Sequence, residues 1–142
     1  MTFKKDKSAG FLANHMARLF ASGLQERISE LGLAPAQFMA LLELWDEDGL
    51  TQKDLVQRLD VEQATMANTL SRMQRDGLIV RRAHSEDRRA QRIFLTDKAR
   101  AVRDDATQAA RQQNERALQA FSEAERGQFL AFMQRAIRSM RG

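Results

Sequence analysis

One stretch of the chain, residues 61–96, joins a helical pattern directly to a β-hairpin pattern. In its first half, Met66, Leu70 and Met73 recur at the i, i+4, i+7 spacing that places an apolar stripe along one side of a helix. Gly77 follows, and glycine readily adopts the left-handed conformation that ends a helix. The composition then changes to strand-forming residues. We therefore expect a helix that leads directly into a two-stranded hairpin.

Two apolar segments separated by a polar loop predict the hairpin. Residues 78–80 are Leu-Ile-Val, which favours a strand, and Ile93 and Leu95 alternate with other residues on the returning strand. Residues 85–90 between them carry no large apolar side chain, as expected of an exposed loop. The helix before the hairpin should run from Glu62 to Asp76, with its polar side facing away from the core.

Positive charge is concentrated in this same stretch. Between positions 72 and 92 the sequence has seven arginines and three acidic residues. This excess of four positive charges equals the net charge of +4 on all 142 residues. A local basic patch of this kind is the electrostatic footprint of nucleic-acid binding. Charge alone is weak support, because a charged stripe is more often a solvated face.

The composition excludes several kinds of site. The chain has the length of one domain, with 43% hydrophobic residues, which is enough for a core. It has no cysteine, which excludes disulfides, thiol-based redox sensing and cysteine-ligated metals. Asp46, Glu47 and Asp48 are consecutive, so on a helix they point about 100° apart and cannot converge on one ion. We therefore expect neither a metal nor a cofactor.

The sequence also bears on location. No apolar run approaches the roughly 18 residues of a membrane-spanning helix. The first ten residues, MTFKKDKSAG, are charged and lack the apolar centre of a secretory signal. We expect a cytoplasmic protein without membrane contact.

Upstream of the central stretch, the apolar spacing predicts three helices. The first runs from Phe11 to Glu30, and a glycine ends it. The second begins at Pro35, which fits a first turn because its missing N–H costs nothing there. The third is short, is capped by Thr51 with Asp54 three residues later, and stops near Asp60. Only a few residues separate it from the next helix, so the two must cross steeply, as in a helix-turn-helix.

Two helices are expected after the hairpin. Thr96 and Asp97 suit the start of a long helix whose apolar line is thin, so we expect it to bury little and lean out from the core. Ser122 and Glu125 form a capping box that opens the last helix, which has the strongest apolar stripe in the chain. Such a face needs a partner surface, so we predict a homodimer built from both chain ends. Ordinary packing within one chain is the alternative.

These elements predict a mainly α fold with a small β wing. Residues 33–96 would form a winged helix-turn-helix lobe that binds DNA. Residues 1–32 and 97–142 would form a helical dimerisation region, so that the whole chain, 1–142, is one domain.

The central stretch also resembles a known family. Residues 50–96 are similar to the MarR family of bacterial winged-helix regulators, and residues 33–38, LAPAQF, resemble the opening of that family's second helix. The most specific likeness is the D-x-R motif within SEDRRA, residues 85–90, followed by a hydrophobic strand and Leu-Thr. The resemblance implies a transcriptional regulator, usually a repressor, that binds a pseudo-palindromic double-stranded DNA operator as a dimer. The fourth helix would enter the major groove and the wing would lie over the minor groove.

Five residues of the fourth helix are candidates for DNA contact. Gln63, Thr65, Asn68 and Arg72 are long or polar enough to reach base edges or phosphates, with Asn and Gln suited to adenine and Arg to guanine. Arg75 lies farther along and should touch phosphate. Positions 67 and 68 hold alanine and asparagine, where the family more often has a hydroxyl and an arginine, so the family's base preference is not carried over.

The wing supplies three more candidates. Asp87 and Arg89 occupy the two fixed positions of the family's D-x-R motif, where the arginine enters the minor groove and the aspartate helps to hold the loop. Arginine suits that groove because its negative potential deepens where it narrows. Arg88 lies between them and is a candidate phosphate contact.

The family also suggests a small-molecule effector. Many members bind small aromatic carboxylates or phenols between the first, second and fifth helices and the DNA-binding lobe. Side chains that would line such a pocket here are His15, Met16, Phe20, Phe38 and Trp45. Apolar residues at helical spacing are more often plain core, and a lone histidine is more often structural than a ligand-binding group.

Two other functions compete with a ligand-responsive regulator. The first is a winged-helix module for protein or RNA contact without ligand response. The second is a small enzyme, which is poorly supported because the two histidines are far apart and the chain has no cysteine, no tyrosine and no phosphate-binding glycine motif.

Overall fold

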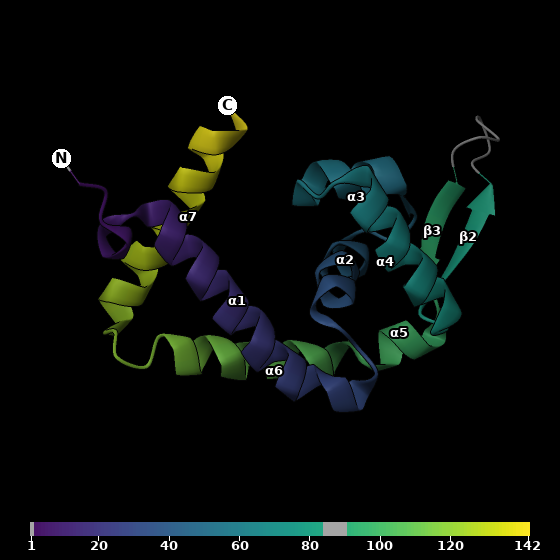
Figure 1. Ribbon diagram of the computed structural model, residues 1–142. Coiled ribbons are helices and arrows are strands. Elements are labelled where there is room, and N and C mark those ends of the chain that lie inside the picture. Colours follow the sequence, from purple (N-terminus) through teal and green to yellow (C-terminus); the bar gives the residue numbers. More distant parts are fainter. Residues whose placement is uncertain (1, 84–90) are drawn as a thin grey trace.

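The computed structural model describes residues 2–83 and 91–142 (Figure 1). Helices α1 and α6 lie side by side, with a lobe formed by α2, α3, α4 and the sheet on one side and α7 on the other. The elements in chain order are η1 (Lys5–Lys7), α1 (Ala9–Ile28), η2 (Ser29–Leu31), α2 (Pro35–Asp46), β1 (Leu50–Thr51), α3 (Gln52–Leu59), α4 (Gln63–Arg75), β2 (Ile79–Ala83), β3 (Gln91–Leu95), α5 (Asp97–Ala101), α6 (Arg103–Ala117) and α7 (Glu123–Arg141). The mainly α fold with a small β wing is confirmed.

The predicted two-stranded hairpin is confirmed, and it belongs to a three-stranded antiparallel sheet whose third strand was not predicted. Strands β2 and β3 pair as predicted, and β1 adds to the other edge of β3 in the order β1-β3-β2. Leu50 lies opposite Ile93 and Thr51 opposite Arg92. A strand of two residues is too short to show an alternating pattern in the sequence. It forms because it pairs with residues more than forty positions away.

Helix α4 begins and ends where the local sequence signals place it. The turn before it contains Asp60 in the left-handed region at φ 53°, which makes the short connection from α3 possible. Gly77 follows the helix at φ 76°. The predicted stripe of Met66, Leu70 and Met73 is buried, and the core around it closes the lobe. The polar side of α4 is left facing outward.

The acidic run at the end of α2 has a structural role. Asp48 Oδ1 accepts hydrogen bonds from the backbone N–H of Leu95 at 2.9 Å and of Gly49 at 3.1 Å. Its Oδ2 pairs with Arg100 at 3.2 Å. One carboxylate thus ties the end of α2 to β3 and to α5, which fixes the sheet against the helices.

The helix after the hairpin differs from the expected one in two ways. It is divided into α5 and α6 at Val102, and α6 does not lean out from the core, so that expectation was wrong. Its Ala106 and Ala109 are buried, and it packs along α1. A Cβ on Gly23 of α1 would lie only 2.2 Å from Gln113 Oε1. Small residues on both helices therefore permit a close approach, so a thin alanine line is enough to bury this face.

Helix α7 contrasts with all of these elements. None of its residues is buried by the described part of the chain, and Leu130, Phe132 and Ile137 are about half exposed or more. Arg126 attaches its start to Glu115 and to the backbone oxygen of Leu118. The predicted strong stripe is present but uncovered. Within the described residues, no helix combines the length and the apolar character needed to cross a membrane.

Candidate nucleic-acid interface

The outward side of α4 carries four of the five residues predicted from its sequence, and the fifth, Gln63, is exposed at the first position of the helix. Each is exposed, in contrast to the buried stripe on the other side of the helix, and the five are Gln63, Thr65, Asn68, Arg72 and Arg75. Helix α4 lies beside the hairpin at one end of the molecule (Figure 1). Helix α4 thus adjoins β2 of the hairpin, next to which these side chains are exposed.

The side chains on this surface differ in how firmly they are held. Gln63 is tied to the preceding helix, because Gln52 Nε2 donates to its Oε1 at 3.4 Å and to its backbone oxygen at 3.5 Å. Thr65, Asn68 and Arg72 make no side-chain hydrogen bond or ion pair with any described residue. Their donors and acceptors are available to a partner.

Arg75 is the exception at the C-terminal end of the helix. Its Nε donates to Asp76 Oδ1 at 3.1 Å, and the other carboxylate oxygen accepts from Gln37 Nε2 at 3.0 Å. These contacts hold the pKa of the Asp76 carboxyl below its ordinary value, with Arg75 the larger cause and Gln37 the second. Sequence reasoning missed Gln37, although it precedes the buried Leu41 by one helical turn on the apolar face of α2. A glutamine on such a face is a signal for a buried hydrogen bond.

The strands of the wing add positive charge next to α4. Asp87, Arg88 and Arg89 lie outside the described residues, but the strands that lead to and from them are described. Arg82 of β2 is directly opposite Arg92 of β3 in the register, so two arginines lie side by side on the hairpin. The Arg82 guanidinium stacks over the Phe94 ring at 5.3 Å from its centroid.

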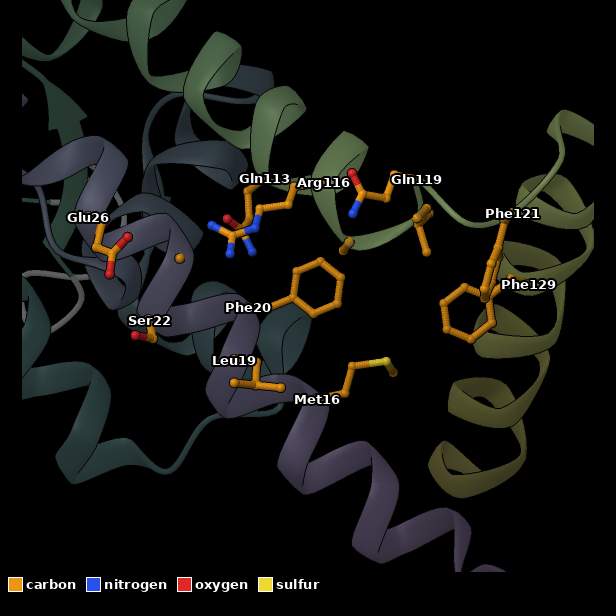
Figure 2. A pocket seen from close by; sticks show the side chains of 13 residues that line it. Met16, Leu19, Phe20, Ser22, Glu26, Gln113, Arg116, Gln119, Phe121 and Phe129 are labelled. Atoms are coloured by element: carbon orange, nitrogen blue, oxygen red, sulfur yellow. The ribbon is translucent and has the colours of Figure 1, made fainter. Parts of the chain in front are cut away.

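The residues proposed for an effector pocket are not brought into one place. Met16 and Phe20 line a cavity of about 420 Å³ between α1, α6 and the start of α7 (Figure 2). Phe20 and Phe38 line a second cavity of about 450 Å³ between α1, α2 and α6. His15 is exposed and packs edge-on against Phe11.

Trp45 lies in the lobe and lines neither cavity. Its ring packs edge-on against Phe38 at 5.9 Å between centroids, and its Nε1 donates to the backbone oxygen of Ala99 at 3.1 Å. It is therefore a core residue that joins α2 to α5. Phe38 connects it to the second cavity.

The two cavities differ chemically. Figure 2 shows Arg116, Glu26 and Gln113 on one side of the first cavity and the paired rings of Phe121 and Phe129 on the other. The second has an apolar lining with Gln113 and Asn114 as its polar side chains, and the rest of the lining is Ala17, Phe20, Ala21, Leu24, Pro35, Ala36, Phe38, Met39, Leu42 and Ala110.

Comparisons with known proteins agree on one group. The model of the MarR family matches residues 31–90. The transcriptional regulator TtmR of Methylorubrum extorquens is 31% identical over 98 residues, which are 69% of this chain and 50% of that protein. The chain thus matches about half the length of this curated relative.

Solved structures match over nearly the whole chain. The crystal structure of a MarR family transcriptional regulator from Silicibacter pomeroyi is 30% identical and has a TM-score of 0.77, with 96% of this chain and 92% of that chain covered. A putative MarR family regulator from Listeria monocytogenes, solved in complex with a 26mer DNA, has a TM-score of 0.86 at 22% identity, with coverages of 94% and 89%. The second likeness shows the fold alone.

Proposed function

Because the chain belongs to the MarR family of transcriptional regulators, we propose that it binds a pseudo-palindromic double-stranded DNA operator as a homodimer. Membership of this family confirms the coarser prediction, a transcriptional regulator and not an enzyme. The observation that carries the proposal is the outward side of α4, where unpartnered polar side chains adjoin an arginine-rich hairpin. Such a surface fits the major groove with the wing over the neighbouring minor groove. We place the protein in the cytoplasm, where the DNA is.

Each candidate residue receives a role on this basis. Thr65, Asn68 and Arg72 reach base edges with free donors and acceptors, and Gln63 does so from a position fixed by Gln52. Arg75 contacts phosphate. In the wing, Arg89 enters the minor groove, Asp87 holds the loop and Arg88 contacts phosphate. The arginines of the two strands, Arg81, Arg82 and Arg92, add positive charge to the wing, which suits a polyanionic partner.

The dimer is supported by the apolar surface at the two ends of the chain. Helix α7 exposes Met140 at 80% of its surface, and α1 exposes Phe11, Leu12 and Leu19. Apolar surface of this extent is typical of an interface between subunits. We propose that residues 1–32 and 97–142 form this dimerisation region and that residues 33–96 form the DNA-binding lobe.

We further propose a repressor that a small aromatic effector releases. The apolar cavity between α1, α2 and α6 joins the helical region to the lobe, and Phe20 and Phe38 line it. Its described lining has no charged side chain, so an aromatic compound with a neutral hydrogen-bonding group suits it better than a carboxylate. Two recognition helices must lie about 34 Å apart on one face of the duplex. A ligand wedged into this joint would change that separation.

One substitution tests the DNA-binding proposal. Arg89→Ala should weaken operator binding by about 1–3 kcal/mol without changing thermal unfolding or dimerisation. The measurement is a gel-shift titration at fixed salt with the DNA immediately upstream of the protein's own gene. Arg111→Ala on α6 removes the same charge away from both the DNA-facing surface and the apolar stripe of α7, and should leave binding unchanged. Equal binding by the Arg89 variant and the wild type would reject the wing assignment.

The alternative, a module for protein or RNA contact without ligand response, is separated by a competition. Wild-type protein should prefer its upstream DNA to duplex DNA of unrelated sequence and to RNA of the same length, at a stated salt concentration. Equal affinity for all three would favour the alternative.

A further inference from the structure

Gln37 is a buried polar residue in the first turn of α2, with 5% of its surface exposed. Both ends of its side-chain amide are used. Its Oε1 accepts from the backbone N–H of Ala34 at 3.1 Å, which caps the start of α2. Its Nε2 donates to Asp76 Oδ2 at 3.0 Å, which connects α2 to the residue that ends α4. Capping α2 needs only the first of these bonds, so the second calls for its own explanation.

Asp76 stands between Gln37 and the DNA-facing surface. One carboxylate oxygen accepts from Gln37, and the other accepts from Arg75 Nε at 3.1 Å. Lys98 Nζ donates to the Asp76 backbone oxygen at 2.7 Å, which anchors the same residue from α5. Asp76 is therefore held on three sides, and its carboxylate in turn holds the guanidinium of Arg75.

Arg75 itself extends into solvent, with 70% of its side chain exposed. With its Nε engaged by Asp76, the two terminal nitrogens of the guanidinium remain free to bind a phosphate with two parallel hydrogen bonds. A free arginine side chain loses rotamer freedom when it binds, and a side chain already held in place loses less. The contact with Asp76 therefore favours phosphate binding.

We infer that Gln37 is a positioning residue for DNA binding, which acts through Asp76 to hold Arg75 at the C-terminal end of the recognition helix. This inference rests on the proposed function, since it assumes that α4 binds DNA. The neighbours of Gln37 in sequence, Ala36 and Phe38, line the apolar cavity between α1, α2 and α6. The contact thus lies between that cavity and the DNA-facing surface.

Exchange of the two polar partners tests the inference. Gln37→Glu keeps an acceptor for Ala34 but sets a carboxylate against Asp76, and it should weaken operator binding about tenfold, the scale of one lost hydrogen bond to a charged group. In the double variant Gln37→Glu, Asp76→Asn, the asparagine amide donates to the glutamate, so the bond is remade in the opposite direction. Affinity should return to within about threefold of wild type if the contact is what matters.

A second double-mutant cycle tests whether the effect of Gln37 on operator affinity depends on Arg75. When Arg75→Gln is already present, adding Gln37→Glu should weaken binding by less than about twofold, because the group that Gln37 positions is absent. A purely structural role for Gln37 would give the full loss in both backgrounds. That result would overturn the inference.

The control for added charge is Gln25→Glu, since Gln25 lines the same surface cleft as Gln37, Arg72 and Arg75. It should change affinity by less than about twofold at moderate salt, where exposed charges are screened. Thermal unfolding of every variant shows which losses of affinity are losses of folded protein. The Asp76 carboxyl, followed by NMR titration, should have a higher pKa in Gln37→Ala than in wild type.

The outcomes separate the two proposals. If wild-type protein binds no duplex DNA selectively, the proposed function fails. If it binds its operator and the Gln37→Glu variant, folded, binds equally well, the proposed function stands and the positioning role is rejected.

Discussion

Helices α4 and α7 differ in how far the described chain covers their apolar stripes. Helix α4 places Met66, Leu70 and Met73 in a closed core and turns only polar groups outward. Helix α7 has an equally regular stripe, yet the described chain buries none of its residues. Periodicity alone predicts an apolar face in both cases. What covers that face depends on the rest of the fold, and for α7 the proposed dimer would supply the cover.

The difference follows from what surrounds each helix. Around α4, helices α2 and α3 and the sheet supply enough apolar surface to enclose it. Beside α7, α6 is mostly polar and uses its few small residues against α1. One chain therefore encloses the hydrophobic core of the lobe, whereas the apolar stripe of α7 remains exposed. Four experiments test this contrast.

The largest effect is expected inside the lobe. Leu70→Ala removes a fully buried side chain and should lower the free energy of unfolding by about 2–5 kcal/mol, measured by chemical denaturation. Ser71→Ala, at the next and exposed position, should change it by less than about 0.5 kcal/mol. Similar values for both would mean that the inner face of α4 is not tightly enclosed.

On α7 the corresponding change should affect assembly instead. Ile137→Asp places a charge in the exposed stripe and should weaken the dimer by about 2 kcal/mol or more, the cost typical of a central interface residue. Sedimentation equilibrium measures it. Gln128→Asp lies on the opposite side of the helix and should leave the dimer intact. A monomeric wild type would remove the contrast altogether.

Substitution of one glycine on α1 and one on α7 compares a closely packed helix with an exposed one. Gly23→Ala forces Gln113 away from its contact with Arg27 and should cost about 1 kcal/mol of folding stability. Gly127→Ala meets nothing in the single chain and should gain about 0.5–1 kcal/mol from the better helix propensity of alanine. Thermal unfolding gives both. A gain at both positions would show that α1 and α6 are not closely packed.

The smallest effect should be seen at the capping boxes that begin α3 and α7. The backbone N–H of Thr51 lowers the pKa of Asp54, and the backbone N–H of Ser122 lowers the pKa of Glu125. Each carboxylate therefore stabilises the start of its helix when the pH is above the ordinary pKa of the group, 3.8 for Asp and 4.5 for Glu. This stabilisation is lost as the pH falls through the lower pKa that the group has in the folded protein.

Amide NMR shifts of Thr51 and Ser122 through this acidic range provide the measurement. The exposed box on α7 should open without cooperating with the lobe, while the box on α3 should open with it. Asp54→Asn and Glu125→Gln keep an acceptor but remove the titration. Simultaneous opening of both boxes in wild type would indicate that α7 is part of the same cooperative unit.

Much of the fold is predictable because its signals are local. Thr51, Gly77, Thr96 and Ser122 each mark a helix end through bonds to residues a few positions away, and all four predictions are confirmed. The outward exposure of the α4 candidates followed from helical periodicity in the same way. The prediction of the family rested on a longer pattern that joins these signals in order.

The features that sequence reasoning missed depend on distant partners. Strand β1 exists because Leu50 and Thr51 meet β3, and α6 lies against α1 because Gly23 leaves room for Gln113. The bond from Gln37 to Asp76 spans 39 positions. None of these pairings leaves a regular spacing in the sequence, so each needed the coordinates.

The position of Trp45, which is fixed by its hydrogen bond to the backbone of Ala99, makes it useful as a spectroscopic probe. The chain contains one tryptophan and no tyrosine, so under selective excitation its intrinsic fluorescence comes from this one indole. The indole touches Phe38, whose ring also lines the apolar cavity between α1, α2 and α6. The protein thus carries an optical reporter at the junction between that cavity and the winged-helix lobe, and small molecules can be screened against it without any added label.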